Sequence, residues 1–167
     1  MKTILLVLGV TVVSLSCNPF SPKLENLPET QINLLGNRNT LDGLFQFFKT
    51  AYELKDTSMY GKMFDESFVF SYFDFQNSVQ INWDRAQEMN TTYRLFRNTE
   101  QITLDWNYYL QKDSSATEAS VVRSFNLTIV ESSQQIYTGT GRARFRLIKL
   151  NPDDPWKFTY WFDDSDF

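Results

Sequence analysis

The second half of the chain alternates between apolar and polar residues, and this pattern narrows the folds that the chain can adopt. From Ile102 to Leu110 every second residue is apolar, which predicts a strand with one buried face. Three further strand candidates follow at 118–130, 136–150 and 156–164, separated by short polar segments such as DSSAT and NPDDP. Strands joined by turns this short are expected to pair antiparallel, so the sequence predicts a four-stranded meander.

The segment before the meander has helical periodicity at its start. Thr40 can cap a helix whose apolar residues recur at helical spacing as far as Tyr52. Asp56 or Thr57 can cap a second, short helix. The segment Glu66–Phe73 is rich in aromatic residues and predicts a strand.

A third helix is expected between this strand and the meander. Asn82 is its predicted cap and Asn98 its predicted end. Its expected apolar face consists of Trp83, Ala86, Met89, Tyr93, Leu95 and Phe96. Helices first and a long antiparallel meander after them define an α+β fold, with the N-terminal helices packed on a curved antiparallel sheet.

This order of elements resembles the nuclear transport factor 2-like superfamily, also called the cystatin-like cone. The resemblance is carried by LFQFFKTAYELKDTSMYGKMFDESFVFSY and by GTGRARFRLIKLNPDDPWKFTYWFDD, and it spans residues 40–167. It implies a cone-shaped pocket on the concave face of the sheet. The superfamily contains enzymes of the isomerase, dehydratase and cyclase type as well as other members, so the resemblance implies a fold and leaves the function open.

The first sixteen residues have the pattern of an export signal. Lys2 supplies a positive charge and Ile4–Leu15 is an apolar run of 12 residues. As a helix this run spans about 18 Å, which is too short for a bilayer core of about 30 Å. We therefore expect residues 1–16 to be a signal peptide, the alternative being a core strand or helix.

Cys17, the only cysteine, follows this run in the sequence SLSC, which resembles the bacterial lipobox. The resemblance implies that Cys17 becomes the acylated N-terminus of an exported cell-envelope lipoprotein, carrying diacylglycerol and a fatty acid such as palmitate. Ser14 and Leu15 depart from the usual lipobox residues, and the alternative is secretion with a free thiol. Asn18 resembles an outer-membrane sorting signal. Residues 17–39 would then form the lipidated end and a tether, and residues 40–167 the domain.

Composition excludes several classes of function. The chain has no histidine, which excludes Ser-His and Cys-His catalysis and most zinc sites. A net charge of −4 argues against a general nucleic-acid partner. The acidic runs at Asp153–Asp154 and Asp163–Phe167 lack the ordered ligand spacing of a calcium loop, so a solvated turn and tail are favoured. No cofactor and no metal are expected.

Pairing the predicted strands places two charges inside the expected cone. Turns centred near Ser133 and Asp153 put Arg123 opposite Ala143, and Ala143 opposite Asp163. The residues predicted to line a ligand pocket on this face are Trp106, Tyr108, Arg123, Trp161 and Asp163. In that interpretation Arg123 receives an anionic ligand, with Trp106 and Tyr108 as aromatic walls, and the pocket could also take a small apolar ligand. The alternative is a structural ion pair of Arg123 with Asp163, or an arginine that reaches solvent.

Three further arginines are predicted on the opposite face of the sheet. Arg144 and Arg146 are expected across from Phe162 and Tyr160, with Arg142 beside them, so cation–π pairing and solvation account for them. The alternative is a docking surface for an acidic protein or for anionic lipid headgroups.

Two functions remain after these exclusions. The favoured one is a membrane-anchored binding or accessory module whose partner is a small ligand, an envelope protein or a second copy of the chain. The other is a pocket enzyme of the isomerase or dehydratase type that uses an aspartate with tyrosine donors. Its candidate residues are Asp74, Asp105 and Asp163 with Tyr72, Tyr108 and Tyr160.

Overall fold

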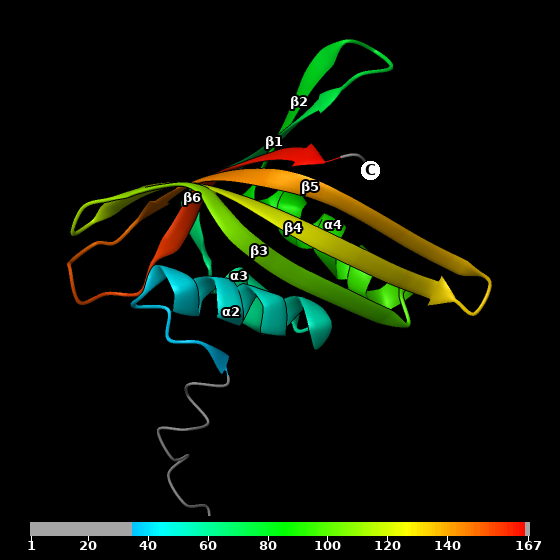
Figure 1. The fold of residues 1–167 in the computed structure, drawn as a ribbon, viewed down its shortest axis with the longest axis horizontal. Helices are drawn as coiled ribbons and strands as arrows, with labels where there is room; N and C mark the ends of the chain where they lie inside the picture. The colour runs from blue at the N-terminus through cyan, green and yellow to red at the C-terminus, as the bar shows by residue number, and fades with distance from the viewer. Residues whose placement is uncertain (1–34, 166–167) are drawn as a thin grey trace, which may run out of the picture.

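The computed structural model describes residues 35–165, in which helices pack on one face of a six-stranded sheet (Figure 1). The helices are α2 (Leu41–Glu53), α3 (Thr57–Gly61) and α4 (Arg85–Asn98). The strands are β1 (Phe64–Asp74), β2 (Val79–Asp84), β3 (Gln101–Ser114), β4 (Glu118–Ser132), β5 (Gln135–Ile148) and β6 (Lys157–Ser165). The predicted α+β class is confirmed. None of the helices in this range combines the length and apolar character needed to cross a membrane.

The strands lie in the order β2-β1-β6-β5-β4-β3. The predicted meander is confirmed, since β3, β4, β5 and β6 pair antiparallel with their neighbours in sequence. The sheet continues beyond the meander because β1 pairs with β6 in parallel and with β2 antiparallel. In Figure 1 the β1–β2 hairpin rises away from the body of the molecule, while α2 and α4 lie under the curved sheet.

An aromatic core fills the space between the helices and the sheet. Phe45 and Phe48 of α2 are buried, and each contacts Phe158 of β6 edge-on, with ring centroids 6.0 and 5.9 Å apart. Phe145 of β5 and Phe68 of β1 are also buried. Edge-to-face contacts of this kind add stability beyond burial alone, so the core fixes the position of α2 on the sheet.

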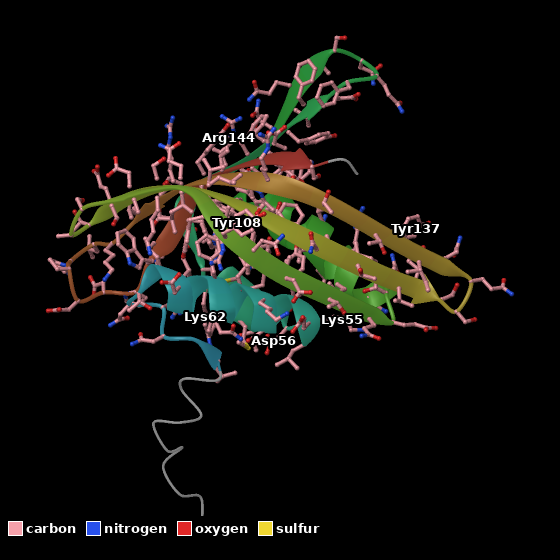
Figure 2. The ribbon with its side chains drawn as sticks, in the orientation of Figure 1. Lys55, Asp56, Lys62, Tyr108, Tyr137 and Arg144 are labelled. Atoms are coloured by element: carbon pink, nitrogen blue, oxygen red, sulfur yellow. The ribbon has the colours of Figure 1, made fainter. Side chains whose placement is uncertain are left out.

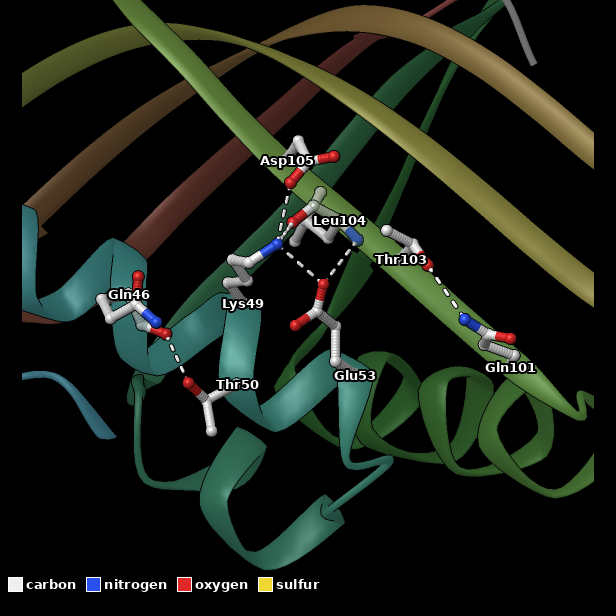
Figure 3. Close-up of polar contacts among 8 residues, drawn as sticks. All are labelled: Gln46, Lys49, Thr50, Glu53, Gln101, Thr103, Leu104 and Asp105. Atoms are coloured by element: carbon white, nitrogen blue, oxygen red, sulfur yellow. Dashed lines mark hydrogen bonds and ion pairs between the residues drawn. The ribbon is translucent and has the colours of Figure 1, made fainter. Parts of the chain in front are cut away.

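A polar cluster joins the solvent side of α2 to the edge strand β3 (Figure 3). The Nζ atom of Lys49 lies 2.7 Å from Glu53 Oε1 and 2.8 Å from Asp105 Oδ1, and it donates to the Leu104 carbonyl at 2.6 Å. Glu53 in turn accepts from the Leu104 amide at 3.3 Å. These bonds use backbone groups that an edge strand would otherwise leave unpaired.

Two of the three predicted helix caps are confirmed. The Thr40 side chain accepts from the Gly43 amide at 3.1 Å, and the Asp56 carboxylate accepts from the Met59 amide at 2.8 Å. In both cases the side chain pairs an amide that the first helical turn leaves free.

The predicted start of the third helix is wrong. Asn82 belongs to the strand β2, and Asp84 caps α4 by accepting from the Gln87 amide at 2.9 Å. Residues 79–84 form a strand because they pair with β1. This pairing stacks the Trp83 ring on that of Phe70, with the ring centres 4.4 Å apart. The buried residues of α4 are Glu88, Thr92 and Phe96, whereas the predicted face residues Ala86 and Tyr93 are exposed.

Candidate functional site

The pairing of β4 with β5 and of β5 with β6 around Ala143 is the one that the sequence predicted. Arg123 pairs with Ala143, and Ala143 pairs with Asp163. Ala143 is fully buried, so the two charged residues lie on either side of a small apolar residue on the concave face. Arg123 packs against Phe45 of α2, on the face opposite to Arg144.

Arg123 is satisfied by its own surroundings. Its guanidinium carbon lies 4.7 Å from the ring centre of Phe45 and 4.5 Å from that of Tyr109. Its Nε donates to the Asn107 carbonyl at 3.1 Å, and its Nη1 donates to the Tyr109 hydroxyl at 3.3 Å. Burial lowers the pKa of Arg123, and the nearby Tyr109 and Asp42 oppose this effect. The structure therefore gives Arg123 a packing role.

Tyr109, and not Tyr108, occupies the concave face beside Arg123. The pairing of β3 with β4 shifts between Trp106 and Tyr109, so the strict alternation read from the sequence is broken by a bulge. Tyr108 is 75% exposed, and the prediction that it lines a pocket is wrong (Figure 2). The Tyr109 hydroxyl donates to Asp42 at 2.5 Å, and this hydrogen bond lowers the pKa of the Asp42 carboxyl.

A cavity of about 150 Å³ lies on the same concave face, between α2, α4 and the sheet. Six aromatic residues line it: Phe48, Tyr52, Phe70, Trp83, Phe125 and Trp161. Leu95, Leu104 and Leu127 add aliphatic surface, and Thr91 and Thr92 of α4 add hydroxyls. Two acidic residues, Asp163 and Glu88, complete the lining.

Asp163 is an acidic residue of the cavity with one oxygen that the described residues leave without a hydrogen bond. Its Oδ1 atom is buried and accepts no hydrogen bond within the described residues. Burial raises the pKa of Asp163 to about 6; the charges of Asp164 and Glu88 add to this rise, and Ser165 opposes it. Because burial brings its pKa close to physiological pH, this carboxyl can both donate and accept a proton there.

Glu88 is the acidic residue of the cavity that the sequence reading missed. It is only 3% exposed, and its carboxylate accepts from the Tyr60 hydroxyl at 2.6 Å, from Thr92 Oγ1 at 2.9 Å and from Trp83 Nε1 at 2.7 Å. The signal was the spacing of residues 88, 92 and 96, which places Glu88 on the same helix face as the buried Phe96.

The two predicted tryptophans have different positions. Trp161 lines the cavity, and its Nε1 is buried without a partner among the described residues. Trp106 packs edge-on against Phe45 at 5.0 Å and Phe48 at 5.3 Å, and it does not line the cavity. Of the predicted pocket residues, the cavity brings together Trp161 and Asp163, while Trp106 and Arg123 lie beside it.

The other two candidate acids of the enzyme hypothesis have structural partners. Asp74 accepts from the Gln76 amide at 2.9 Å and from the Asn77 amide at 3.0 Å, which shapes the β1–β2 turn. Asp105 is paired with Lys49 in the cluster of Figure 3. Asp163 is therefore the one of the three that enters the cavity.

The outer face carries the arginines in the predicted arrangement. The guanidinium of Arg144 lies 5.9 Å from the ring centre of Phe162, and that of Arg146 lies 5.4 Å from that of Tyr160. Arg142 pairs with Asp164 at 2.8 Å. Figure 2 labels Arg144 on this face. Pairing within the sheet accounts for each of these cations.

Several other predicted features lie outside the cavity or outside the described residues. Cys17, the signal peptide and most of the tether lie outside the described residues, as do Asp166 and Phe167. Asp154 accepts from the Asn151 amide at 2.9 Å and so belongs to the β5–β6 turn. Between residues 35 and 165, no cluster of three or more His, Cys, Asp or Glu side chains is arranged to hold a metal ion.

The sequence matches no protein-family model and no curated protein. Solved structures do match. A Streptomyces avermitilis protein provisionally described as a dehydratase of the nuclear transport factor 2-like family aligns with a TM-score of 0.58 and 14% identity, over 81% of this chain and 96% of its own.

Two proteins of unknown function are also similar in structure. One, from Nostoc punctiforme and described as having a cystatin-like fold, aligns with a TM-score of 0.57 and 11% identity, over 75% of this chain and 88% of its own. The other, from Mycobacterium tuberculosis, aligns with a TM-score of 0.61 and 17% identity, over 86% and 78% of the two chains. The chain therefore has the nuclear transport factor 2-like, or cystatin-like, fold, and at these identities the likeness concerns the fold alone.

Proposed function

We propose that this domain binds a small, mostly apolar molecule in the cavity between α2, α4 and the concave sheet. The observation that carries the proposal is Asp163, whose buried Oδ1 accepts no hydrogen bond from residues 35–165 and lies in a hollow lined mainly by aromatic and aliphatic side chains. Leaving a buried polar atom unpaired is costly, so a ligand group that bonds to it offsets that cost.

The size of the cavity limits the ligand. A volume of about 150 Å³ is below the range of drug-sized pockets, and apolar cavities of this size hold a single six-membered ring. The aromatic lining favours a compact ligand that is apolar on most sides and carries one polar group for Asp163.

Cyclohexanol is a suitable probe for this proposal, with binding followed by tryptophan fluorescence and calorimetry on the full chain. Thr91 is exposed and lies on the lining, so T91F is expected to block the cavity without disturbing the core. Arg94 is exposed on the same helix and does not line the cavity, so R94F is the matched control. Binding that is lost in T91F and kept in R94F supports the proposal. Cyclohexanol binding that T91F does not change contradicts it.

A second candidate function is proton-transfer catalysis, and the specific observation in its favour is the pKa of about 6 at Asp163. A carboxyl whose pKa lies near physiological pH is suited to general acid or base catalysis, and the Tyr52 ring lines the same cavity. The test is exchange of the α-protons of cyclohexanone in D₂O, followed by NMR. An exchange rate above that in buffer without protein, lost in D163N, supports catalysis. A rate equal to that in buffer contradicts catalysis, and only the binding proposal then remains.

We also propose that Cys17 anchors the domain to a bacterial cell-envelope membrane, with the outer membrane as its address. The support is in the sequence: an apolar run after Lys2, the small Ser16 before the only cysteine, and Asn18 after it. One acyl chain gives marginal membrane binding and two or more give a stable anchor. The mass of the N-terminal peptide from cells decides this, because an unmodified Cys17 would refute the anchor.

A further inference from the structure

The cavity has an uncompensated negative charge. Glu88 and Asp163 both line it, and the lining contains no lysine or arginine. Within the described residues neither carboxyl forms an ion pair, since the groups that bond to Glu88 are the neutral Tyr60, Thr92 and Trp83. An anionic ligand would add a third negative charge to a desolvated site, so this class is strongly disfavoured.

The walls of the cavity are suited to a cation. Six of the lining residues are aromatic, and Trp83, the ring type that attracts cations most strongly, is stacked on Phe70 with the planes inclined by 13°. Trp161 meets Phe70 edge-on at 4.9 Å, so the rings that line the cavity differ in orientation. Aromatic cages of this kind recognise alkylated ammonium groups.

The protein already holds one cation in the same way. The guanidinium of Arg123 lies within 6 Å of the ring centres of Phe45, Trp106 and Tyr109, with Asp42 close enough to influence its charge. The cavity repeats this chemistry on the same concave face, with rings and carboxyls in place and the cation not supplied by the lining residues.

We propose that the ligand of the cavity is a small alkylated amine or quaternary ammonium compound, held by the aromatic rings and by the carboxyls of Asp163 and Glu88. This inference rests on the proposed function, which assigns the cavity to a small molecule, and adds the charge of that molecule. The Nε1 of Trp161 is a buried donor without a partner among the described residues, so an acceptor oxygen on the ligand completes the match. An amino alcohol has both features.

The test compares choline with 3,3-dimethyl-1-butanol, which has the same shape and hydroxyl group but no charge. Binding to the full chain is followed at pH 7.5 by calorimetry and by the fluorescence of Trp83 and Trp161. Choline is expected to bind at least tenfold more tightly than the neutral compound. An equal or higher affinity for the neutral compound overturns the inference.

Asp163 provides the decisive variant. D163N keeps the shape and removes the charge, so choline affinity is expected to fall at least tenfold, and affinity for the neutral compound is expected to fall by much less. Asp113 is an exposed aspartate of β3 that does not line the cavity, and D113N is the charge-matched control that leaves both affinities unchanged. Equal losses of choline binding in D163N and D113N would show only a long-range charge effect and overturn the inference.

The outcomes separate the two proposals. If cyclohexanol or 3,3-dimethyl-1-butanol binds in a manner blocked by T91F, and choline does not bind more tightly, the cavity is a neutral-ligand site and only the ammonium inference fails. If choline binding is unaffected by T91F, the cation binds elsewhere and the inference also fails. If none of the three compounds binds at the cavity, both proposals fail together.

Discussion

Arg123 and Asp163 flank Ala143 on the same face of the sheet, but their charged groups differ in how many hydrogen-bond partners surround them. Arg123 lies among three aromatic rings and donates to the Asn107 carbonyl and the Tyr109 hydroxyl. Asp163 lines the cavity with a buried oxygen that accepts no hydrogen bond from the part of the chain that the structure describes. A satisfied buried charge is explained by stability, whereas an unsatisfied one lowers stability and is retained for another reason. The contrast therefore separates the part of the cone that holds the fold together from the part that is available to a ligand.

The largest expected effect is at Asp163, where removal of the charge should stabilise the protein. The folded state raises the pKa of Asp163 from 3.8 to about 6, so it holds the proton more tightly than the unfolded chain. The contribution of this group is therefore fully favourable below pH 4 and is lost as the pH rises through 6. D163N escapes that loss and should gain up to about 3 kcal/mol at pH 8, and only a small fraction of this at pH 4.

Urea unfolding of both proteins across this pH range measures the effect. The charged groups near Asp163 are Glu88 of α4 and Asp164 of β6. Burial raises the pKa of Tyr52 of α2, so its hydroxyl stays neutral across this range. A gain in stability that is the same at pH 4 and pH 8 would show that packing, not the charge, is responsible.

The next largest expected effect is a loss of stability when Arg123 is replaced. R123L removes two hydrogen bonds and the cation–π contacts while keeping apolar bulk, so it should lower the free energy of unfolding by about 2 kcal/mol. Because Arg123 does not line the cavity, binding of the cavity probes should be unchanged. Loss of cyclohexanol binding in a folded R123L protein would mean that the two regions are not separate.

A smaller effect tests the bulge that places Tyr109 beside Arg123. Y109F removes the hydroxyl that donates to Asp42 and accepts from Arg123, which should cost about 1 kcal/mol. Its neighbour Tyr108 is exposed, so Y108F should change stability by less than about 0.5 kcal/mol. A larger loss of stability in Y108F than in Y109F, measured by thermal unfolding, would indicate that Tyr108 is the buried residue, as regular alternation predicts.

The smallest effect is expected on the outer face. Arg144 is exposed and has Asp164 at 3.6 Å and Phe162 beneath it, and exposed pairs of this kind contribute little. R144Q should shift the free energy of unfolding by less than about 0.5 kcal/mol in chemical denaturation. A loss comparable to that of R123L would show that the outer face is as important for folding as the concave one.

The sequence predicted the meander and its register because two short turns fix which residues face each other. Arg123, Ala143 and Asp163 were placed correctly from turn positions alone. The same reasoning was wrong at Tyr108, since a bulge interrupts the alternation and nothing local in the sequence marks it. Local propensity cannot show a long-range contact. Pairing with β1 makes residues 79–84 a strand, although the sequence predicted that a helix capped by Asn82 begins within this segment.

The cavity was predicted only in part, for a related reason. Trp161 and Asp163 follow from the strand register, but Tyr52, Trp83 and Glu88 come from other elements whose packing no turn specifies. Glu88 in particular is a charged residue inside the protein, which simple apolar patterning assigns to the surface.

The parallel pairing of β1 with β6 has a consequence for the order of folding. It joins segments that lie far apart in the sequence, and such closure is slow compared with forming hairpins between neighbouring strands. Phe70 of β1 and Trp161 of β6 are partners in this pairing, and both are walls of the cavity. The cavity is thus complete only once the last strand has docked, so a ligand held there stabilises the finished fold over any partly folded form.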